Sequence, residues 1–314
     1  MLDPLCKAGI LGMNRRNADF IMQYNPRSIF PLVDNKVLTK GLAEKHQVPT
    51  PPTYYVVESN SEIAGLKEGL SRYNDFVVKP ARGGGGSGIL LISDRTAEGF
   101  VKPSGKVVSW EDLAFHISNI LSGIYSLGGL PDKAIIEGLL HPDPVFAAIT
   151  YRGVPDIRLV VYRGVPVMGM VRLPTIASDG TANLHRGGIG AGIDIGSGRT
   201  LTAVYRTNVV THHPDTGNPV SGIQVLYWDE MLHMAARAKD MTGMGYLGVD
   251  LVLDRDRGPL LLELNARPGL SIQLANVAGL FGRLQLTEKA PPEIFATPES
   301  RVSWARESFK VSAS

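Results

Sequence analysis

Three polar residues with oxygen-bearing side chains stand in two apolar segments near the end of the chain. The segments are Tyr246–Asp254 and 259–266, and the four residues between them have the composition of a turn. A symmetric hairpin about that turn pairs residues whose numbers sum to 513, so that Asp250 lies opposite Glu263. Asn265 comes two positions after Glu263 and therefore points to the same face of the strand.

Two carboxylates that face each other across neighbouring strands repel, and leucine and valine side chains surround this pair. A cation would remove the repulsion. Ligands that offer only oxygen atoms suit Mg²⁺, which commonly also holds nucleotide phosphates. The sequence therefore predicts a Mg²⁺ site made of Asp250, Glu263 and Asn265, with Mn²⁺ as an acceptable substitute. The alternative is a solvated acidic pair on an exposed sheet face.

A glycine-rich segment, residues 83–88, follows a predicted strand that carries Lys79. A dinucleotide-binding fold would need a helix next, but residues 89–93 have the pattern of another strand, and the Gly-Lys-Ser/Thr ending of a P-loop is absent. A glycine loop between strands can instead fold over a triphosphate and offer its backbone N–H groups, with Lys79 as a point charge. The alternative is a flexible hairpin turn. The loop residues concerned are Gly84, Gly85, Gly86 and Ser87.

Composition indicates an ordinary globular protein. The 314 residues have a formal net charge of +2, with 44% hydrophobic and 20% charged residues, which gives no case for nucleic acid as a partner. The single cysteine, Cys6, excludes an intramolecular disulfide and suits a reducing compartment. No apolar run is long enough to predict a membrane span, and no secretory signal is apparent. We therefore expect a cytoplasmic protein.

The hydrophobic pattern predicts an α+β chain with antiparallel hairpins rather than a doubly wound parallel sheet. Asp156–Tyr162 and Val165–Leu173 are expected to form one such hairpin, whereas residues 174–200 are polar and glycine-rich. Asp34, Ser61 and Asp229 are expected to cap helices. The remaining predicted helices span 34–47, 61–73, 111–121 and 229–241, and the remaining strands span 53–57, 75–80, 89–93 and 133–140.

Several other residues have both a functional and a structural interpretation. Within residues 187–198 the glycines suit either a mobile substrate loop or an irregular connection. Arg15 and Arg16 suit an anion site or a solvated basic pair. His212 and His213 lack partners at metal-ligand spacing and are expected in a surface loop. Cys6 is expected to be an ordinary residue, and the methionines of one helix to fill the core; these are Met231, Met234, Met241 and Met244.

Taken together, these motifs resemble those of the ATP-grasp carboxylate–amine ligases. The chain is most similar to RimK-type α-L-glutamate ligase-related proteins with a shortened N-terminal segment. Five segments carry the resemblance, in the family's order. They are Asp34-Asn35-Lys36 with Val48-Pro49-Thr50-Pro51; Val78-Lys79-Pro80 with the glycine loop; Asp156-Ile157-Arg158; Asn183-Leu184-His185-Arg186-Gly187-Gly188; and Gly248-Val249-Asp250 with Glu263-Leu264-Asn265-Ala266-Arg267-Pro268-Gly269.

The resemblance implies an ATP-grasp fold, two α+β subdomains with ATP between them. It divides the chain into a shortened N-terminal segment (1–33), an N-terminal half with the glycine flap (34–138), a C-terminal half with the metal site (139–285) and a polar tail (286–314). It also implies residue roles. Lys36 and Lys79 contact ATP phosphates, Glu137 and Leu139 lie at the adenine, and Asp156 lies near the ribose. Arg172, Asn183 and Arg186 face the phosphates and an acyl phosphate. Arg267 contacts a carboxylate or phosphate, and His185 is either a general base or a hydrogen-bonding loop residue.

The function implied is ATP-dependent formation of an amide through an acyl phosphate, with small-molecule or peptide carboxylate and amine substrates. Addition of glutamate or another amino acid is one form of this reaction. A phosphotransferase and a non-catalytic ATP-binding regulatory module are the alternatives. Two departures concern the substrate pocket. The segment ahead of Lys36 is short, and Arg267 takes a position that is usually small in glutamate ligases. A homo-oligomer would be one way to complete the pocket.

Overall fold

The computed structural model describes residues 9–126 and 128–311, and Cys6 therefore lies outside the described residues. The chain divides into two compact units, each formed by segments that are not contiguous in sequence. The small unit comprises Asn35–Lys40 and Pro51–Leu140. The large unit comprises Met1–Asp34, Gly41–Thr50 and His141–Ser314. Helix α5 (Lys36–Lys45) has residues in both.

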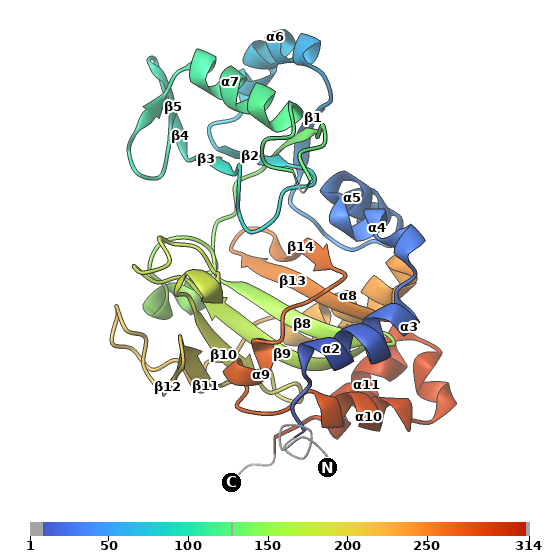
Figure 1. Cartoon of the computed structure of the whole chain (residues 1–314). Coiled ribbons are helices and arrows are strands. Elements are labelled where there is room, and N and C mark those ends of the chain that lie inside the picture. Colours follow the sequence, from blue (N-terminus) through green and yellow to red (C-terminus); the bar gives the residue numbers. More distant parts are fainter. Residues whose placement is uncertain (1–8, 127, 312–314) are drawn as a thin grey trace. The chain divides into compact units, whose positions relative to one another are not determined.

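The small unit is built on a four-stranded antiparallel sheet with the order β1-β7-β2-β3 (Figure 1). One face of the sheet packs its apolar side chains, among them Val78 and Ile136, with residues of two helices. A separate three-stranded sheet has the order β4-β5-β6. The elements are β1 (Thr53–Val57), α6 (Asn60–Gly69), η3 (Leu70–Arg72), β2 (Phe76–Pro80), β3 (Leu90–Ile92), β4 (Asp94–Thr96), β5 (Gly99–Val101), β6 (Val107–Val108), α7 (Trp110–Leu121) and β7 (Ala134–Glu137).

The large unit contains a seven-stranded antiparallel sheet with the order β12-β11-β10-β9-β8-β13-β14 (Figure 1). Its strands are β8 (Asp156–Tyr162), β9 (Val165–Leu173), β10 (Ile189–Ile193), β11 (Thr200–Tyr205), β12 (Asn208–Val210), β13 (Tyr246–Asp254) and β14 (Gly258–Asn265). Its helices and helical turns are α2 (Met13–Arg15), η1 (Arg16–Ile21), α3 (Met22–Tyr24), η2 (Arg27–Ile29), α4 (Pro31–Asp34), η4 (Pro144–Ile149), η5 (Leu184–Arg186), α8 (Trp228–Thr242), α9 (Ile272–Ala275), α10 (Phe281–Glu288), η6 (Pro292–Phe295) and α11 (Pro298–Ser308).

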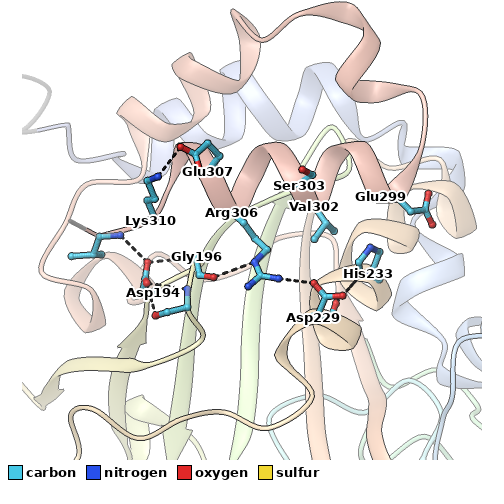
Figure 2. A pocket seen from close by; sticks show the side chains of 12 residues that line it. Asp194, Gly196, Asp229, His233, Glu299, Val302, Ser303, Arg306, Glu307 and Lys310 are labelled. Atoms are coloured by element: carbon cyan, nitrogen blue, oxygen red, sulfur yellow. Dashed lines mark hydrogen bonds and ion pairs between the residues drawn. The ribbon is translucent and has the colours of Figure 1, made fainter. Parts of the chain in front are cut away.

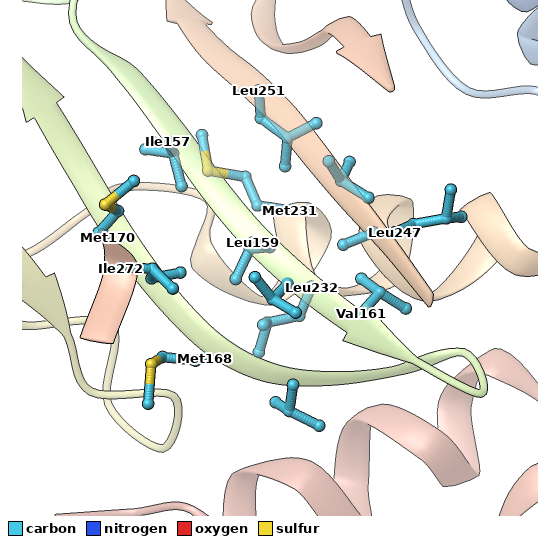
Figure 3. Close-up of a cluster of buried hydrophobic side chains, with 14 of the residues drawn as sticks. Ile157, Leu159, Val161, Met168, Met170, Met231, Leu232, Leu247, Leu251 and Ile272 are labelled. Atoms are coloured by element: carbon cyan, nitrogen blue, oxygen red, sulfur yellow. The ribbon is translucent and has the colours of Figure 1, made fainter. Parts of the chain in front are cut away.

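The two faces of the large sheet are covered differently. Alternate residues of β8 and β13, such as Leu159 and Leu247, belong to the buried cluster that includes Met231 and Leu232 of α8 (Figure 3). On the opposite face, Tyr162 and Tyr246 pack with Phe20 of the N-terminal segment at ring-centroid distances of 5.4 and 6.0 Å. That aromatic cluster covers only one end of the second face, and the other end of the same strands carries charged residues. The four methionines Met231, Met234, Met241 and Met244 are buried, as predicted.

The hairpin β8–β9 begins and ends at the predicted residues, and the strand Thr53–Val57 also matches. The α+β class with antiparallel hairpins is confirmed, and the helix predicted for 229–241 corresponds to α8. The predicted helix-capping residues agree less well with the structure. The backbone N–H of Val37 donates to Asn35 Oδ1 at 3.0 Å, so that Asn35 rather than Asp34 supplies the cap of α5.

The expectation of a mobile loop or irregular connection over residues 187–198 is wrong, because Ile189–Ile193 is the buried strand β10 between β9 and β11. Glycine there serves close packing rather than mobility. A Cβ atom on Gly192 would lie 2.9 Å from the backbone oxygen of Ala275 in α9. The strand pattern was obscured because two of its five residues carry no side chain.

Three further expectations differ from the structure. His213 is 1% exposed rather than in a solvated loop, and its ring Nε2 lies 3.0 Å from the carbonyl oxygen of Pro174. Arg16 is buried rather than solvated. Helix α11 lies in the stretch expected to be a polar tail, where Arg301 is buried and contacts Asp240. In each case a polar residue is buried because a specific partner satisfies its hydrogen bonds, which sequence patterning does not register. None of the described helices combines the length and apolarity needed to cross a bilayer.

Candidate active site

A row of charged side chains crosses four neighbouring strands of the large sheet. Residues directly opposite each other in an antiparallel pair share a face. Asp156 of β8 pairs with Arg172 of β9, and Asp250 of β13 pairs with Arg158 of β8 and with Glu263 of β14. The register therefore brings three carboxylates and two guanidinium groups to the face opposite α8.

The hairpin β13–β14 places its polar residues as the sequence predicted. Asp250 lies opposite Glu263, and Asn265 lies opposite Gly248 on the same face. Nearer the turn, however, Leu251 pairs with Leu261, so the register shifts by one residue at an irregularity beside Asp250. A bulge of this kind leaves one residue unpaired and bends the strand. The predicted symmetric register therefore holds for the polar end of the hairpin alone.

Asp250 is the centre of the network. Arg158 Nε donates to Asp250 Oδ1 at 2.6 Å, and the Nη2 group of the same side chain contacts Oδ2. Arg172 Nη2 donates to Asp250 Oδ2 at 2.8 Å and to Asp156 Oδ2 at 2.7 Å. Arg172 thus bridges the two aspartates, and Asp250 accepts charge-assisted bonds from both arginines.

Glu263 and Asn265 lie at the less buried end of the network. Glu263 Oε1 is 4.0 Å from Arg158 Nη2, and its side chain is 33% exposed, against 1% for Asp250. Asn265 Nδ2 lies 3.3 Å from Glu263 Oε1 and 3.4 Å from Asp250 Oδ2. The amide therefore connects the two carboxylates that the sequence paired.

Burial and charge act in opposite directions on the two aspartates. Burial raises the pKa of Asp156 to about 7, and the attraction of Arg172 does not fully offset it. Burial would also raise the pKa of Asp250, but the charges of Arg158 and Arg172 outweigh burial and hold it well below its usual range. Asp250 therefore stays ionised at neutral pH, whereas Asp156 keeps its proton to a higher pH than an exposed aspartate does.

The structure changes the argument for a metal. Repulsion between Asp250 and Glu263 does not by itself require a bound cation, because the Arg158 guanidinium already lies beside both. Within the described residues, no group of three or more His, Cys, Asp and Glu side chains could hold a metal ion. Asn265 directs its Nδ2 group toward both carboxylates, so its Oδ1 atom would become the third oxygen ligand on reversal of the amide. This oxygen-only set fits Mg²⁺, provided that Asp250 shares its oxygens with the arginines.

The small unit holds a second charged cluster. Lys79 on β2 and Glu137 on β7 form an ion pair on the sheet face opposite the helices, and Glu137 is 1% exposed. Lys40 of α5 approaches the same carboxylate at 2.6 Å. Burial opposes ionisation of Glu137, but the charges of Lys79 and Lys40 outweigh it and lower its pKa. Burial lowers the pKa of Lys40, so both partners depend on each other to remain charged.

The glycine-rich loop connects the antiparallel strands β2 and β3, as predicted. Residues 84–87 are exposed, and Gly85, Gly86 and Gly88 adopt positive φ angles. Lys36 Nζ donates to the carbonyl oxygen of Gly83 at 2.7 Å. The loop therefore presents its backbone to solvent next to one of the lysines assigned to phosphate. At the end of β7, Gly138 N donates to the carbonyl oxygen of Pro52 at 2.9 Å, and Leu139 follows it partly buried.

Other predicted residues lie outside these two clusters. Asn183 caps the turn η5, since its Oδ1 accepts from the backbone N–H of His185 at 2.9 Å. His185 and Arg186 are exposed on that turn, which leads into β10. Arg267 is exposed, and its guanidinium lies 4.8 Å from the ring centroid of Phe30.

Two residues of the clusters were not assigned a role from the sequence, Arg158 and Lys40. Arg158 follows Asp156 by two positions on the same strand, so period-two alternation placed it on the same face. Lys40 follows Lys36 by one helical turn. In both cases the spacing along the chain indicated the correct face of the strand or helix. The carboxylate that each residue contacts, Asp250 or Glu137, lies far away in the sequence.

A cavity of about 880 Å³ lies elsewhere in the large unit, between α11, the start of α8 and the turn after β10 (Figure 2). None of the predicted site residues lines it. Its charged groups pair with one another: Arg306 Nη1 donates to Asp229 at 2.8 Å, and Lys310 contacts Glu307 at 2.7 Å. Asp194 accepts from the backbone of Ser197 and Val311. These interactions tie the C-terminal helix to the sheet.

Comparison with known proteins identifies the fold. The model of the family described as sugar-transfer associated ATP-grasp matches residues 15–289. No curated protein matches the chain. A solved pyruvate carboxylase from Rhizobium etli aligns with a TM-score of 0.54 and 16% identity over 95% of this chain and 21% of that chain.

Two other solved structures are less similar. D-alanyl-alanine synthetase A from Vibrio cholerae aligns with a TM-score of 0.49 and 12% identity, over 89% of this chain and 66% of that chain. The ATP-grasp ligase PsnB, solved with minimal precursor, Mg and ADP, aligns with a TM-score of 0.47 and 14% identity, over 85% of this chain and 61% of that chain. The chain thus spans less than two thirds of these proteins' length.

Proposed function

The chain belongs to the sugar-transfer associated ATP-grasp family, and from this premise we propose that it is an ATP-dependent ligase. The reaction would join a carboxylate to an amine through an acyl phosphate. The γ-phosphoryl group passes from ATP to the carboxylate and leaves ADP. The amine then attacks the acyl carbon and expels phosphate, so that the amide is short of one water relative to its two substrates.

The observation that carries the proposal is the charged row on the large sheet. Asp250 is almost completely buried, and two guanidinium groups keep it ionised. Such a desolvated network costs free energy and contributes little net stability, so its presence favours a functional role. Glu263 and Asn265 extend the network toward solvent, which makes the row accessible to a bound ion or nucleotide.

In this proposal Asp250, Glu263 and Asn265 hold Mg²⁺. The ion, when bound, would neutralise nucleotide phosphates and the charge that develops during phosphoryl transfer. Arg172 and Arg186 would offset negative charge on the transferring group and the acyl phosphate. Asp156, whose pKa is raised to about 7, would accept a hydrogen bond from, or donate one to, the ribose.

The small unit would contribute the remaining nucleotide contacts. Lys79 and Lys36 would bind phosphate oxygens, and Glu137 with the backbone at Leu139 would lie at the adenine. The exposed residues 84–87 would close over the phosphates and exclude water from the acyl phosphate. Lys79 would then exchange part of its ion pair with Glu137 for the phosphates, while Lys40 continues to neutralise Glu137.

The proposal also concerns the class of substrates that the ligase joins. The motifs resemble those of glutamate ligases, and the family's description associates it with sugar transfer. We therefore include glutamate, other amino acids, short peptides, amino sugars and sugar acids among the substrates to test. Two alternatives make different products. A phosphotransferase would leave a stable phosphorylated product, and a regulatory module would bind ATP without turnover.

The test is phosphate release from ATP and Mg²⁺ with these compounds, singly and in pairs, followed by mass spectrometry. A ligase requires two substrates and yields a product lighter than their sum by one water. Phosphate release or transfer with one acceptor and no amide would overturn the proposal in favour of a phosphotransferase. ATP binding without turnover on every pair would favour the regulatory module.

A further inference from the structure

The connection between β9 and β10, residues 174–188, is a loop closed by its own side chains. Thr175 is completely buried, and its Oγ1 donates to the carbonyl oxygen of Gly187 at 2.7 Å, across the base of the loop. Ser178 N donates to Thr175 Oγ1 at 3.1 Å, and Ser178 Oγ accepts from Thr175 N at 2.9 Å. Arg186, which the proposed function places at the acyl phosphate, directly precedes Gly187. The two ends of the loop are therefore joined beside Arg186.

Hydrogen bonds within a loop fix its shape, but its orientation depends on what it is attached to. A turn from a distant part of the sequence, residues 213–218 in the connection between β12 and α8, supplies such an attachment. Backbone bonds close this turn: His213 N donates to the carbonyl oxygen of Asn218 at 2.8 Å, and Gly217 N donates to that of His213 at 2.8 Å. The turn contacts the start of the loop at two points.

The first contact is made by His213, which is 1% exposed. Its ring Nε2 lies 3.0 Å from the carbonyl oxygen of Pro174, and its Nδ1 lies 3.2 Å from Asp215 N and 3.3 Å from Thr216 N. A backbone N–H can only donate, so Nδ1 accepts and the ring proton is on Nε2, which donates to Pro174. The neutral imidazole thus organises the turn with one nitrogen and holds the loop with the other.

The second contact is made by Asp215, whose Oδ2 accepts from Ile176 N at 2.7 Å. The turn therefore holds the loop on both sides of Thr175, through Pro174 and through Ile176. Because Thr175 also closes the loop, a displacement at its position is passed to Gly187 and to the neighbouring arginine. Asp215 is exposed, so its hydrogen bond orients the loop without forming part of the core.

We propose that His213 and Asp215 are positioning residues, which orient this loop and thereby hold Arg186 at the acyl phosphate during amide formation. They act through the base of the loop and touch no substrate themselves. The role of Arg186 rests on the proposed ligase function, whereas the attachment of the loop to the turn does not. The orientation matters for the rate, because a misplacement of about 1 Å can cost on the order of 100-fold.

The test compares three variants of the full chain. Asp215→Ala removes the acceptor of Ile176 N from an exposed position, and Asp215→Asn is the matched control, because its amide oxygen keeps an acceptor there. His213→Phe removes both ring nitrogens. We expect it to fold, because the carbonyl oxygen of Pro174 keeps its bond from Tyr151 N at 3.2 Å, and the two released N–H groups belong to exposed residues and can bond to water.

Two measurements are made on each variant. Hydrogen–deuterium exchange of the amides in residues 174–188 needs no substrate and reports whether the turn holds the loop. Phosphate release on the active substrate pair gives kcat and the KM for ATP. We expect faster exchange in Asp215→Ala and His213→Phe, with kcat lowered on the order of 10-fold and 10- to 100-fold. The KM for ATP should stay within about twofold of wild type, because the other proposed nucleotide contacts are unchanged. Asp215→Asn should match wild type in both measurements.

Three results would overturn the proposal. Wild-type exchange in both Asp215→Ala and His213→Phe would show that the turn does not hold the loop. Faster exchange with an unchanged kcat would remove the positioning role, and equal losses in Asp215→Asn and Asp215→Ala would show that the bond to Ile176 is not the cause. A wild-type chain that turns over ATP with no substrate pair would instead refute the ligase, and the exchange measurement would still decide whether the turn holds the loop.

Discussion

Asp250 and Glu263 are proposed to share one ion, but the structure predicts different consequences when each is neutralised. The substitutions are Asp250→Asn and Glu263→Gln, which remove a charge while preserving the side-chain shape. Asp250 is buried beneath two arginines, whereas Glu263 is one third exposed and lies 4.0 Å from Arg158 Nη2. Comparing the two substitutions therefore distinguishes a charge that stabilises the fold from a charge that only binds the ion.

The expected changes in unfolding free energy follow from how deeply each carboxylate is buried. Asp250→Asn leaves Arg158 and Arg172 without their main counter-ion, and breaking a buried pair in this way costs about 3–5 kcal/mol of unfolding free energy. Glu263→Gln removes the charge of a partly exposed side chain while keeping its shape, and ion pairs of partly exposed side chains contribute about 0–1 kcal/mol. Both variants are expected to lose ATP turnover, because each removes one of two anionic oxygen ligands from the proposed Mg²⁺ site.

The assay combines urea denaturation, which gives the unfolding free energy, with Mg²⁺-dependent phosphate release on the active substrate pair. Asp256→Asn is the control, since Asp256 is an exposed carboxylate in the turn of the same hairpin. We expect it to match wild type in both measurements. Before substrates are identified, Mg²⁺-dependent binding of ATP replaces turnover as the readout.

Two results would refute the reasoning. Turnover at the wild-type level in folded Glu263→Gln would remove Glu263 from the ion site. Wild-type stability of Asp250→Asn would show that Asp250 is not the charge that holds the two arginines together.

Two further predictions concern the large sheet. Asp156 has a raised pKa in the folded state, so between its ordinary value of 3.8 and about 7 the folded chain binds more protons than the unfolded chain. Its contribution to stability therefore falls as pH rises through that range, and wild type should lose stability relative to Asp156→Asn between pH 4 and pH 7. Urea denaturation at several pH values measures this, and parallel pH curves for the two proteins would contradict the raised pKa. Gly192→Ala should cost about 1–3 kcal/mol, because its Cβ would lie 2.8 Å from Asn276 Oδ1 and 2.9 Å from the carbonyl oxygen of Ala275. Gly84→Ala, where no atom lies within 4 Å, is the control in thermal denaturation, and equal losses at both positions would rule out close packing as the cause.

Local pattern was sufficient for much of the fold. Alternating hydrophobicity and turn residues predicted β8 and β9 to the residue, and they predicted that Asp250 lies opposite Glu263. These features depend on neighbours a few residues apart, which the sequence displays directly. The hydrophobic pattern led to wrong predictions in two segments. The glycines of β10 are typical of a loop, and the charged residues of α11, including the buried Arg301, are typical of a solvated tail.

The sequence by itself therefore determined the types of chemistry: oxygen ligands on one strand face, lysines beside a glycine loop, and the motifs of an ATP-grasp chain. The tertiary structure decided which charges meet. Arg158 and Asp250 are 92 residues apart, and they touch because β8 pairs with β13. Arg267 meets Phe30 because the N-terminal segment lies against the loop after β14. Contacts of this range depend on strand order and packing, which no local periodicity encodes.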